Sequence, residues 1–149
     1  MEGVEPWEIG QPASDSYPNY KLYTDPLPAF FNGLGYKTVF LSTAPLSFLN
    51  QRNFLSGTKF STIIGEEAFL NQPKYVFDAA PDSALYEKAL ALIHEKKPGK
   101  PLFLAMQTIS SHKPYRAPGA TNERTAFAYS DQQLKAFYDT LKKEGFFKQ

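Results

Sequence analysis

The strongest chemical candidate in the sequence is a histidine that directly follows a continuously apolar segment. His112 lies four residues beyond the apolar segment 102–108. Such a segment predicts a buried strand, and open α/β sheets bind ligands beyond the carboxyl ends of their strands. An imidazole at that place can hydrogen-bond or neutralise an anionic oxygen. The alternative is an ordinary loop histidine in solvent. That description fits His94, which lies inside an amphipathic helical pattern.

Arg52 is the second candidate, and it follows another predicted strand, 36–41. A guanidinium presents a planar fork of donors that matches phosphate or sulfate oxygens. The alternative is a surface arginine on a helix. Because parallel strands deliver their following loops to one edge of a sheet, we expect Arg52 and His112 to lie on the same edge. Together they predict a site for a tetrahedral anion.

The remaining polar residues predict no catalytic residue and no metal ligand. Asp25, Asp82 and Asp131 stand at predicted helix starts, where capping explains them, and the pair Glu66–Glu67 begins a short helix. The chain has no cysteine, and we find no His-x-His, Asp-x-Asp, glycine-rich phosphate loop or serine elbow. The residue pattern therefore supplies anion-contacting groups without a complete catalytic set.

Composition excludes several classes of protein. Aromatic residues make up 15% of the 149 residues, which is too much apolar surface for a disordered chain. With 16 basic and 15 acidic residues and no basic stripe, the sequence does not indicate a nucleic-acid partner. The longest apolar runs have five residues, too few to cross a bilayer, and the N-terminus does not resemble a signal peptide.

Hydrophobic periodicity and helix boundaries predict an α/β chain in which helices alternate with buried strands. Residues 1–22 form an extended lead-in segment and residues 23–149 a partial domain with a mostly parallel sheet. Three helices have predicted apolar faces, made of Leu27, Phe30, Phe31 and Leu34 in the first, of Leu85, Ala89, Leu92 and Ile93 in the second, and of Leu134, Phe137, Tyr138 and Leu141 in the third. The expected strands are 36–41, 102–108 and a short one over 75–77. The expected helices are 26–34, opened by Asp25 and Pro26, 46–57, a short one over 66–71, 83–97, capped by Asp82, and 130–144, opened by a Ser130–Gln133 capping box. Residues 110–121 are expected to form a loop.

Four stretches resemble the sulfatase and alkaline-phosphatase superfamily, closest to its lipoteichoic-acid-synthase-like (phosphoglycerol transferase) branch. They are residues 27–38, 48–54, 101–115 and 129–145, and their order matches the middle of that family's catalytic domain. The resemblance implies a three-layer α/β/α fold of which only part is present. By it, His112 matches a histidine that contacts the substrate phosphate or sulfate. Arg52 matches an arginine that binds the head group, and Asn50 stands where that branch often has a tryptophan.

The resemblance also implies an activity. Family members carry a threonine, serine or formylglycine nucleophile upstream of this region and an Asp-His metal pair downstream, and neither is found here. We therefore expect a fragment that is inactive alone. Its parent would be a sulfatase-like hydrolase or a phosphoglycerol- or phosphoethanolamine-type transferase acting on sulfate or phosphate esters.

The implied parent uses a divalent metal (Mn, Mg or Ca) and is membrane-anchored, with its catalytic domain outside the cytoplasm. The expected partners are the ester substrate and the rest of the catalytic domain. The alternative is a non-catalytic anion-binding or partner module derived from the same fold.

Overall fold

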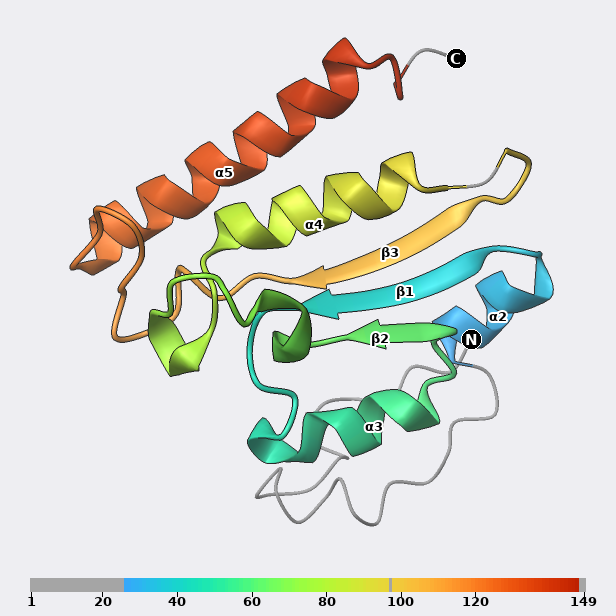
Figure 1. Cartoon of the computed structure of the whole chain (residues 1–149), viewed down its shortest axis with the longest axis horizontal. Helices are drawn as coiled ribbons and strands as arrows, with labels where there is room; N and C mark the ends of the chain where they lie inside the picture. Colours follow the sequence, from blue (N-terminus) through green and yellow to red (C-terminus); the bar gives the residue numbers. More distant parts are fainter. Residues whose placement is uncertain (1–25, 97, 148–149) are drawn as a thin grey trace. The chain divides into compact units, whose positions relative to one another are not determined.

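The computed structural model of the chain describes residues 26–96 and 98–147. Its sheet has three strands in the order β2-β1-β3, and the three arrows point the same way in Figure 1. The strands are β1 (Lys37–Ser42), β2 (Thr62–Ile64) and β3 (Leu102–Gln107). The prediction of neighbouring parallel strands over 36–41 and 102–108 is confirmed. The three-residue β2 was not predicted, since so short a strand leaves no readable alternation.

The central strand carries the deepest residues of the sheet. Val39 and Leu41 of β1 are fully buried. Every residue of β3, which has only β1 as a neighbour in this sheet, is half-buried. The prediction that 102–108 is a buried strand is therefore met only in part, because the strand forms but stays half-buried. Its apolar sequence suits burial, but its place at the sheet edge leaves it partly exposed.

The described residues divide into two compact units. The first comprises residues 26–40, 46–64 and 98–105, and the second comprises 41–45, 65–96 and 106–147. The predicted lead-in over 1–22 and the capping residue Asp25 lie outside the described residues. Each unit has its own packing and hydrogen bonds.

In the first unit, α2 (Leu27–Gly33) leads directly into β1. Gly35 takes φ +82°, a left-handed conformation that favours glycine and ends helices. Phe31 stacks on Phe103 with ring centroids 4.4 Å apart. The other residues of the predicted apolar face are exposed, because periodicity identifies a face but not what covers it; they are Leu27 (42% exposed), Phe30 (57%) and Leu34 (58%).

A polar contact joins the start of β1 to the residue before β2. Ser61 N–H donates to Thr38 Oγ1 at 2.9 Å, and Thr38 N–H donates to Ser61 Oγ at 3.0 Å. The Thr38 hydroxyl also donates to Asn32 Oδ1 of α2 at 2.8 Å. Thr38 is fully buried, so its hydroxyl depends on Ser61 and Asn32 for its hydrogen bonds.

The helix predicted over 46–57 forms in two pieces. A short 3-10 helix, Phe48–Asn50, precedes α3 (Gln51–Gly57). Leu49 (φ 50°) and Asn50 (φ 55°) have a left-handed backbone conformation, which separates the 3-10 helix from α3. The short helix predicted over 66–71 is a 3-10 helix at Glu66–Phe69.

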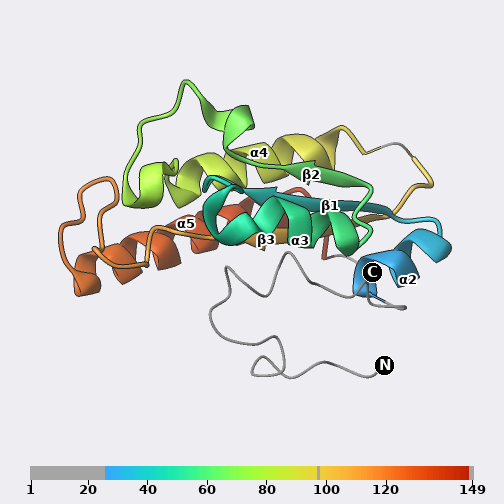
Figure 2. The same ribbon diagram turned by 90° about the horizontal axis from the view of Figure 1, so that it is seen from below.

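In the second unit, α4 (Asp82–His94) and α5 (Glu123–Lys143) lie side by side in both Figure 1 and Figure 2. Tyr86 of α4 stacks on Phe137 of α5, with ring centroids 4.9 Å apart. Phe137 and Leu141 are half-buried, as the predicted apolar face requires. Leu134 and Tyr138 are about half exposed, so that part of the prediction is wrong.

The predicted start of α5 is also wrong. The capping box is formed by Asn122 and Thr125: Thr125 N–H donates to Asn122 Oδ1 at 3.1 Å, and Asn122 N–H donates to Thr125 Oγ1 at 3.3 Å. The helix therefore begins seven residues before Ser130. A serine followed three residues later by glutamine matches the capping-box pattern, but it also occurs inside helices.

The short strand predicted over 75–77 does not form. Val76–Asp78 is a 3-10 turn in which Phe77 has φ 52°. Val76 and Ala79 are buried with Ala44 and Ile109 in one apolar cluster. No helix among the described residues is long and apolar enough to cross a membrane.

Replacing Thr38 by valine tests the polar contact between β1 and β2. Valine keeps the branched shape but removes the hydrogen bonds of the hydroxyl to Ser61 and Asn32, so we expect a loss of about 1–3 kcal/mol in the free energy of unfolding, at about 0.5–1.5 kcal/mol for each bond. Thr38→Ser keeps the hydroxyl and removes one methyl group, with an expected loss of about 1 kcal/mol. Urea denaturation compares the two. A Thr38→Val loss no larger than that of Thr38→Ser would show that the hydroxyl contributes nothing.

Candidate functional site

His112 lies in the loop that follows β3, in the second unit, and its side chain is exposed. Its backbone N–H donates to Ile109 O at 2.9 Å, and its carbonyl accepts from Tyr115 N–H at 2.8 Å. The loop predicted over 110–121 is thus a sequence of tight turns. His112 occupies the end of the first turn and the beginning of the second.

One ring nitrogen of His112 is already engaged. Nδ1 lies 2.8 Å from Lys113 O. Because a carbonyl oxygen only accepts, Nδ1 carries the hydrogen in this contact. Nε2 is then the ring nitrogen that a ligand can meet. It donates to an anionic oxygen when the imidazole is protonated, and it accepts from a hydroxyl when the imidazole is neutral.

A buried carboxylate fixes the backbone just before His112. Asp82 is fully buried, and its Oδ1 accepts the N–H groups of Ile109 (2.9 Å) and Ser110 (3.1 Å). Its Oδ2 accepts from the Ser130 hydroxyl of α5 at 2.9 Å. The prediction that Asp82 caps the helix over 83–97 is therefore wrong. Asp82 is the first residue of α4. Its side chain binds instead the loop that follows β3 and carries His112, residues 108–115, which we call the His112 loop.

The cap of α4 comes from other segments of the second unit. The Asp82 N–H donates to Ser110 Oγ at 3.0 Å, so Ser110 and Asp82 exchange hydrogen bonds. The Ser83 N–H lies 3.4 Å from the Tyr129 hydroxyl, which donates to Ser83 Oγ at 3.0 Å. The start of α4, the His112 loop and α5 are thus joined by one hydrogen-bond network.

Two tyrosines packed beside this network, Tyr86 and Tyr129, have a raised pKa, chiefly because they are partly buried. Burial, and then the nearby charge of Asp82, raise the pKa of Tyr86 above its usual value. Burial also raises the pKa of Tyr129. The hydrogen bonds from Ser83 oppose that shift, and Asp82 adds to it. Both tyrosines are held in the neutral form that their packing requires.

An aromatic residue contacts the imidazole. The ring of Phe77 meets that of His112 edge to face, with centroids 4.7 Å apart and an interplanar angle of 67°. The sequence predicted a strand over 75–77 and no role for Phe77. Because Phe77 and His112 are 35 residues apart and belong to no common motif, no signal in the sequence could have identified the contact.

Arg52 lies in the first turn of α3, in the first unit, and is exposed. Its backbone N–H donates to Leu46 O at 2.8 Å, which joins α3 to the segment after β1. The structure confirms that Arg52 and His112 each follow a strand of one parallel sheet. That their side chains converge on one anion stays a prediction.

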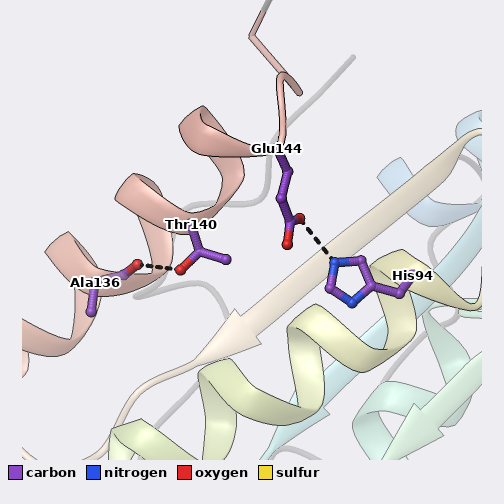
Figure 3. Close-up of polar contacts among 4 residues, drawn as sticks. All are labelled: His94, Ala136, Thr140 and Glu144. Carbon is purple, nitrogen blue, oxygen red and sulfur yellow. Dashed lines mark hydrogen bonds and ion pairs between the residues drawn. The ribbon is translucent and has the colours of Figure 1, made fainter.

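His94 is exposed, as predicted, and it has a partner of its own. The His94 Nε2 lies 2.9 Å from Oε2 of Glu144, the residue that follows α5. Figure 3 shows this pair, together with the hydrogen bond that the Thr140 hydroxyl donates to Ala136 O within α5. The His94 side chain is 51% exposed and that of Glu144 is 34% exposed, so this ion pair contributes little to stability. His94 therefore serves as an internal reference for His112.

The described residues do not fit a metal ion. Within 26–96 and 98–147 there is no group of three His, Cys, Asp or Glu side chains that could hold one. The groups in this part of the chain that can contact an anion are the His112 imidazole, on a loop that Asp82 holds, and the Arg52 guanidinium, in the first turn of α3.

Comparison with known proteins defines the family. The sulfatase family model matches residues 8–148, so the chain belongs to the sulfatase family. Among solved structures, it is similar to the lipoteichoic acid synthase LtaP from Listeria monocytogenes, with a TM-score of 0.75 and 24% identity over 87% of this chain. It is also similar to a protein of the alkaline phosphatase superfamily from Vibrio parahaemolyticus, with a TM-score of 0.67 and 30% identity over 76% of the chain.

A third similar structure is the phosphoglycerol transferase GacH of Streptococcus pyogenes in complex with sn-glycerol-1-phosphate, with a TM-score of 0.57 and 17% identity over 73% of this chain. The matched region is 36%, 30% and 33% of these three proteins, so the chain spans about a third of their length. No curated protein matches the chain. The fold is thus that of the alkaline-phosphatase superfamily, as the sequence resemblance predicted.

Removing the Asp82 carboxylate should destabilise the second unit. In Asp82→Ala the N–H groups of Ile109 and Ser110 lose their acceptor in a buried place, and we expect a loss of about 3–5 kcal/mol in the free energy of unfolding. Asp82→Asn keeps an acceptor oxygen and should cost less. Asp131→Ala, at an exposed site on α5, is the control and should change stability by less than about 0.5 kcal/mol. Equal losses in Asp82→Ala and Asp131→Ala would contradict the role of Asp82.

The two raised tyrosine pKa values predict a loss of stability in alkali. The unfolded chain ionises its tyrosines near pH 10, before Tyr86 and Tyr129 ionise in the folded chain. Their stabilising contribution is complete below that pH and is lost as the pH rises through the raised values. We expect Tyr129→Phe to reduce the fall of the urea midpoint with pH above about 10. An unchanged pH dependence in Tyr129→Phe and Tyr86→Phe would contradict the prediction.

Proposed function

We propose that this chain supplies the substrate-anion contacts of a sulfatase-type catalytic domain that hydrolyses or transfers a phosphate or sulfate ester. His112 holds a substrate oxygen through Nε2, and Arg52 pairs with the anionic head group. The reaction we favour is a phosphoglycerol-type transfer. The likeness to a phosphoglycerol transferase whose structure contains sn-glycerol-1-phosphate supports this choice.

The observation that carries the proposal is the way in which His112 is presented. Its backbone is held through Asp82, its Nδ1 is engaged by Lys113 O, and its Nε2 is left for a ligand. A side chain that is oriented before the ligand arrives loses little conformational freedom on binding.

His112 and Arg52 have separate tasks in this proposal. The Arg52 fork binds the anion in the ground state, so its loss mainly weakens binding. The His112 contact strengthens as charge builds on the oxygen during ester cleavage, so its loss also lowers the rate in the complete enzyme. The nucleophile and a divalent metal (Mn, Mg or Ca) come from parts of the catalytic domain other than the residues described.

The complete protein, in this proposal, is anchored in the cell membrane with its catalytic domain outside the cytoplasm. Similarity to the fold of a lipoteichoic acid synthase supports it. Its partners are the ester substrate and the remaining part of the domain. The alternative, a binding module without catalysis, uses the same anion contacts.

Titrating the chain with sn-glycerol-1-phosphate tests the anion site. The sequence has only two histidines, so their imidazole signals in nuclear magnetic resonance are easily assigned with a His94→Gln variant. We expect the His112 signals to shift and saturate while those of His94 stay in place. We expect Arg52→Ala to weaken binding about tenfold or more, because a charge-assisted contact contributes about 1.5–3 kcal/mol.

Lys142→Ala, in the last turn of α5, removes the same charge and is the matched control. It should leave the affinity within about twofold of the wild type, because an exposed charge remote from the ligand is screened by salt. If Arg52→Ala and Lys142→Ala weaken the binding of sn-glycerol-1-phosphate equally, Arg52 contributes only its nonspecific charge, and its proposed role is refuted. Unmoved His112 signals would refute the site.

A further inference from the structure

We propose that Phe77 is a specificity-determining residue that packs against the alcohol part of the ester whose anionic group His112 holds. The proposal rests on the proposed function, because it takes His112 as the anion contact. It adds a second subsite, apolar and aromatic, beside the imidazole. It concerns only residues of the second unit.

The first observation is the position of the ring. Phe77 meets His112 at 4.7 Å between centroids and is nevertheless 41% exposed. A phenyl ring that served only to fill the core would be covered. This ring presents apolar surface to solvent directly beside the polar group that the ligand is proposed to meet.

The second observation is the backbone that puts the ring there. Phe77 has φ 52° and ψ 34°, and Asp78 follows with φ 57°. For a bulky aromatic residue this left-handed conformation is an outlier, and such strained residues cluster at ligand sites. Asparagine or glycine would occupy the position with less strain. The chain keeps a phenylalanine at this position despite the strain.

The turn around Phe77 is held from both ends. Ala79 N–H donates to Val76 O at 3.0 Å, and Tyr75 N–H donates to Ala79 O at 2.9 Å. Val76 (1% exposed) and Ala79 (0%) pack in one cluster with Ile109. Ile109 is also the residue whose N–H Asp82 binds and whose carbonyl accepts from His112. One anchored residue therefore fixes the positions of Phe77 and His112 together.

The chemistry of the ring defines what it can recognise. A phenyl group has no conventional hydrogen-bond donor, so it gains little from a phosphate oxygen. It gains by covering the C–H surface of an alcohol such as glycerol or a sugar. Phe77 should therefore distinguish a phosphate ester from inorganic phosphate, whereas His112 contacts the anionic group common to both.

The test compares two ligands on the full chain, with the His112 imidazole signals as readout. In Phe77→Gly we expect about fivefold to tenfold weaker binding of sn-glycerol-1-phosphate, while inorganic phosphate binds within about twofold of the wild type. Because glycine relieves the strained conformation as the ring contacts are lost, the melting temperature should stay within about 3 °C. Phe77→Asn, which tolerates the same backbone, should repeat the result. Leu70→Ala, which alters an apolar residue 74% exposed in the same unit, should change neither affinity.

Each outcome decides between the two proposals. If Phe77→Gly leaves both affinities unchanged, or weakens both ligands equally, the subsite is refuted and the anion site at His112 stands. If both Phe77 variants lose the fold, the ring is structural and the subsite is likewise refuted. If neither ligand moves the His112 signals of the wild type, the anion site and the subsite are refuted together.

Discussion

The carboxylate of Asp82 is the interaction on which the rest of the second unit depends. It is fully buried and accepts three hydrogen bonds, two from the backbone of the loop after β3 and one from Ser130 of α5. A buried acceptor of this kind is costly to leave unpaired, so its partners can move only together. The start of α4, the His112 loop and α5 are consequently fixed as one assembly.

That assembly explains how an exposed histidine can be a defined contact. Loops are usually mobile because few buried groups hold them. Here the residues just before His112 are held by Asp82 and by the apolar cluster around Ile109, and the imidazole itself is oriented by Lys113 O. The exposed His112 side chain therefore stands on a backbone that contacts within the protein already hold in place.

The first unit is held by different means, chiefly by stacked aromatic rings and by the exchange of hydrogen bonds between Thr38 and Ser61. The chain as a whole belongs to the sulfatase family. The similar solved structures are about three times as long as the matched region. Much of an α/β domain lies in the layers that cover its sheet and in the strands that extend it.

The sequence by itself determined the local features of this protein. Continuous apolar runs predicted β1 and β3, glycine after an amphipathic pattern predicted the end of α2, and four short stretches identified the superfamily, because each of these signals lies within a few neighbouring residues. Tertiary structure alone decided the rest. An aspartate before a helical pattern predicts a helix cap. Only the folded structure shows that Asp82 instead binds a loop 27 residues away in the sequence. Likewise only the folded chain brings Phe77 against His112, because the contact comes from two turns that no periodicity connects.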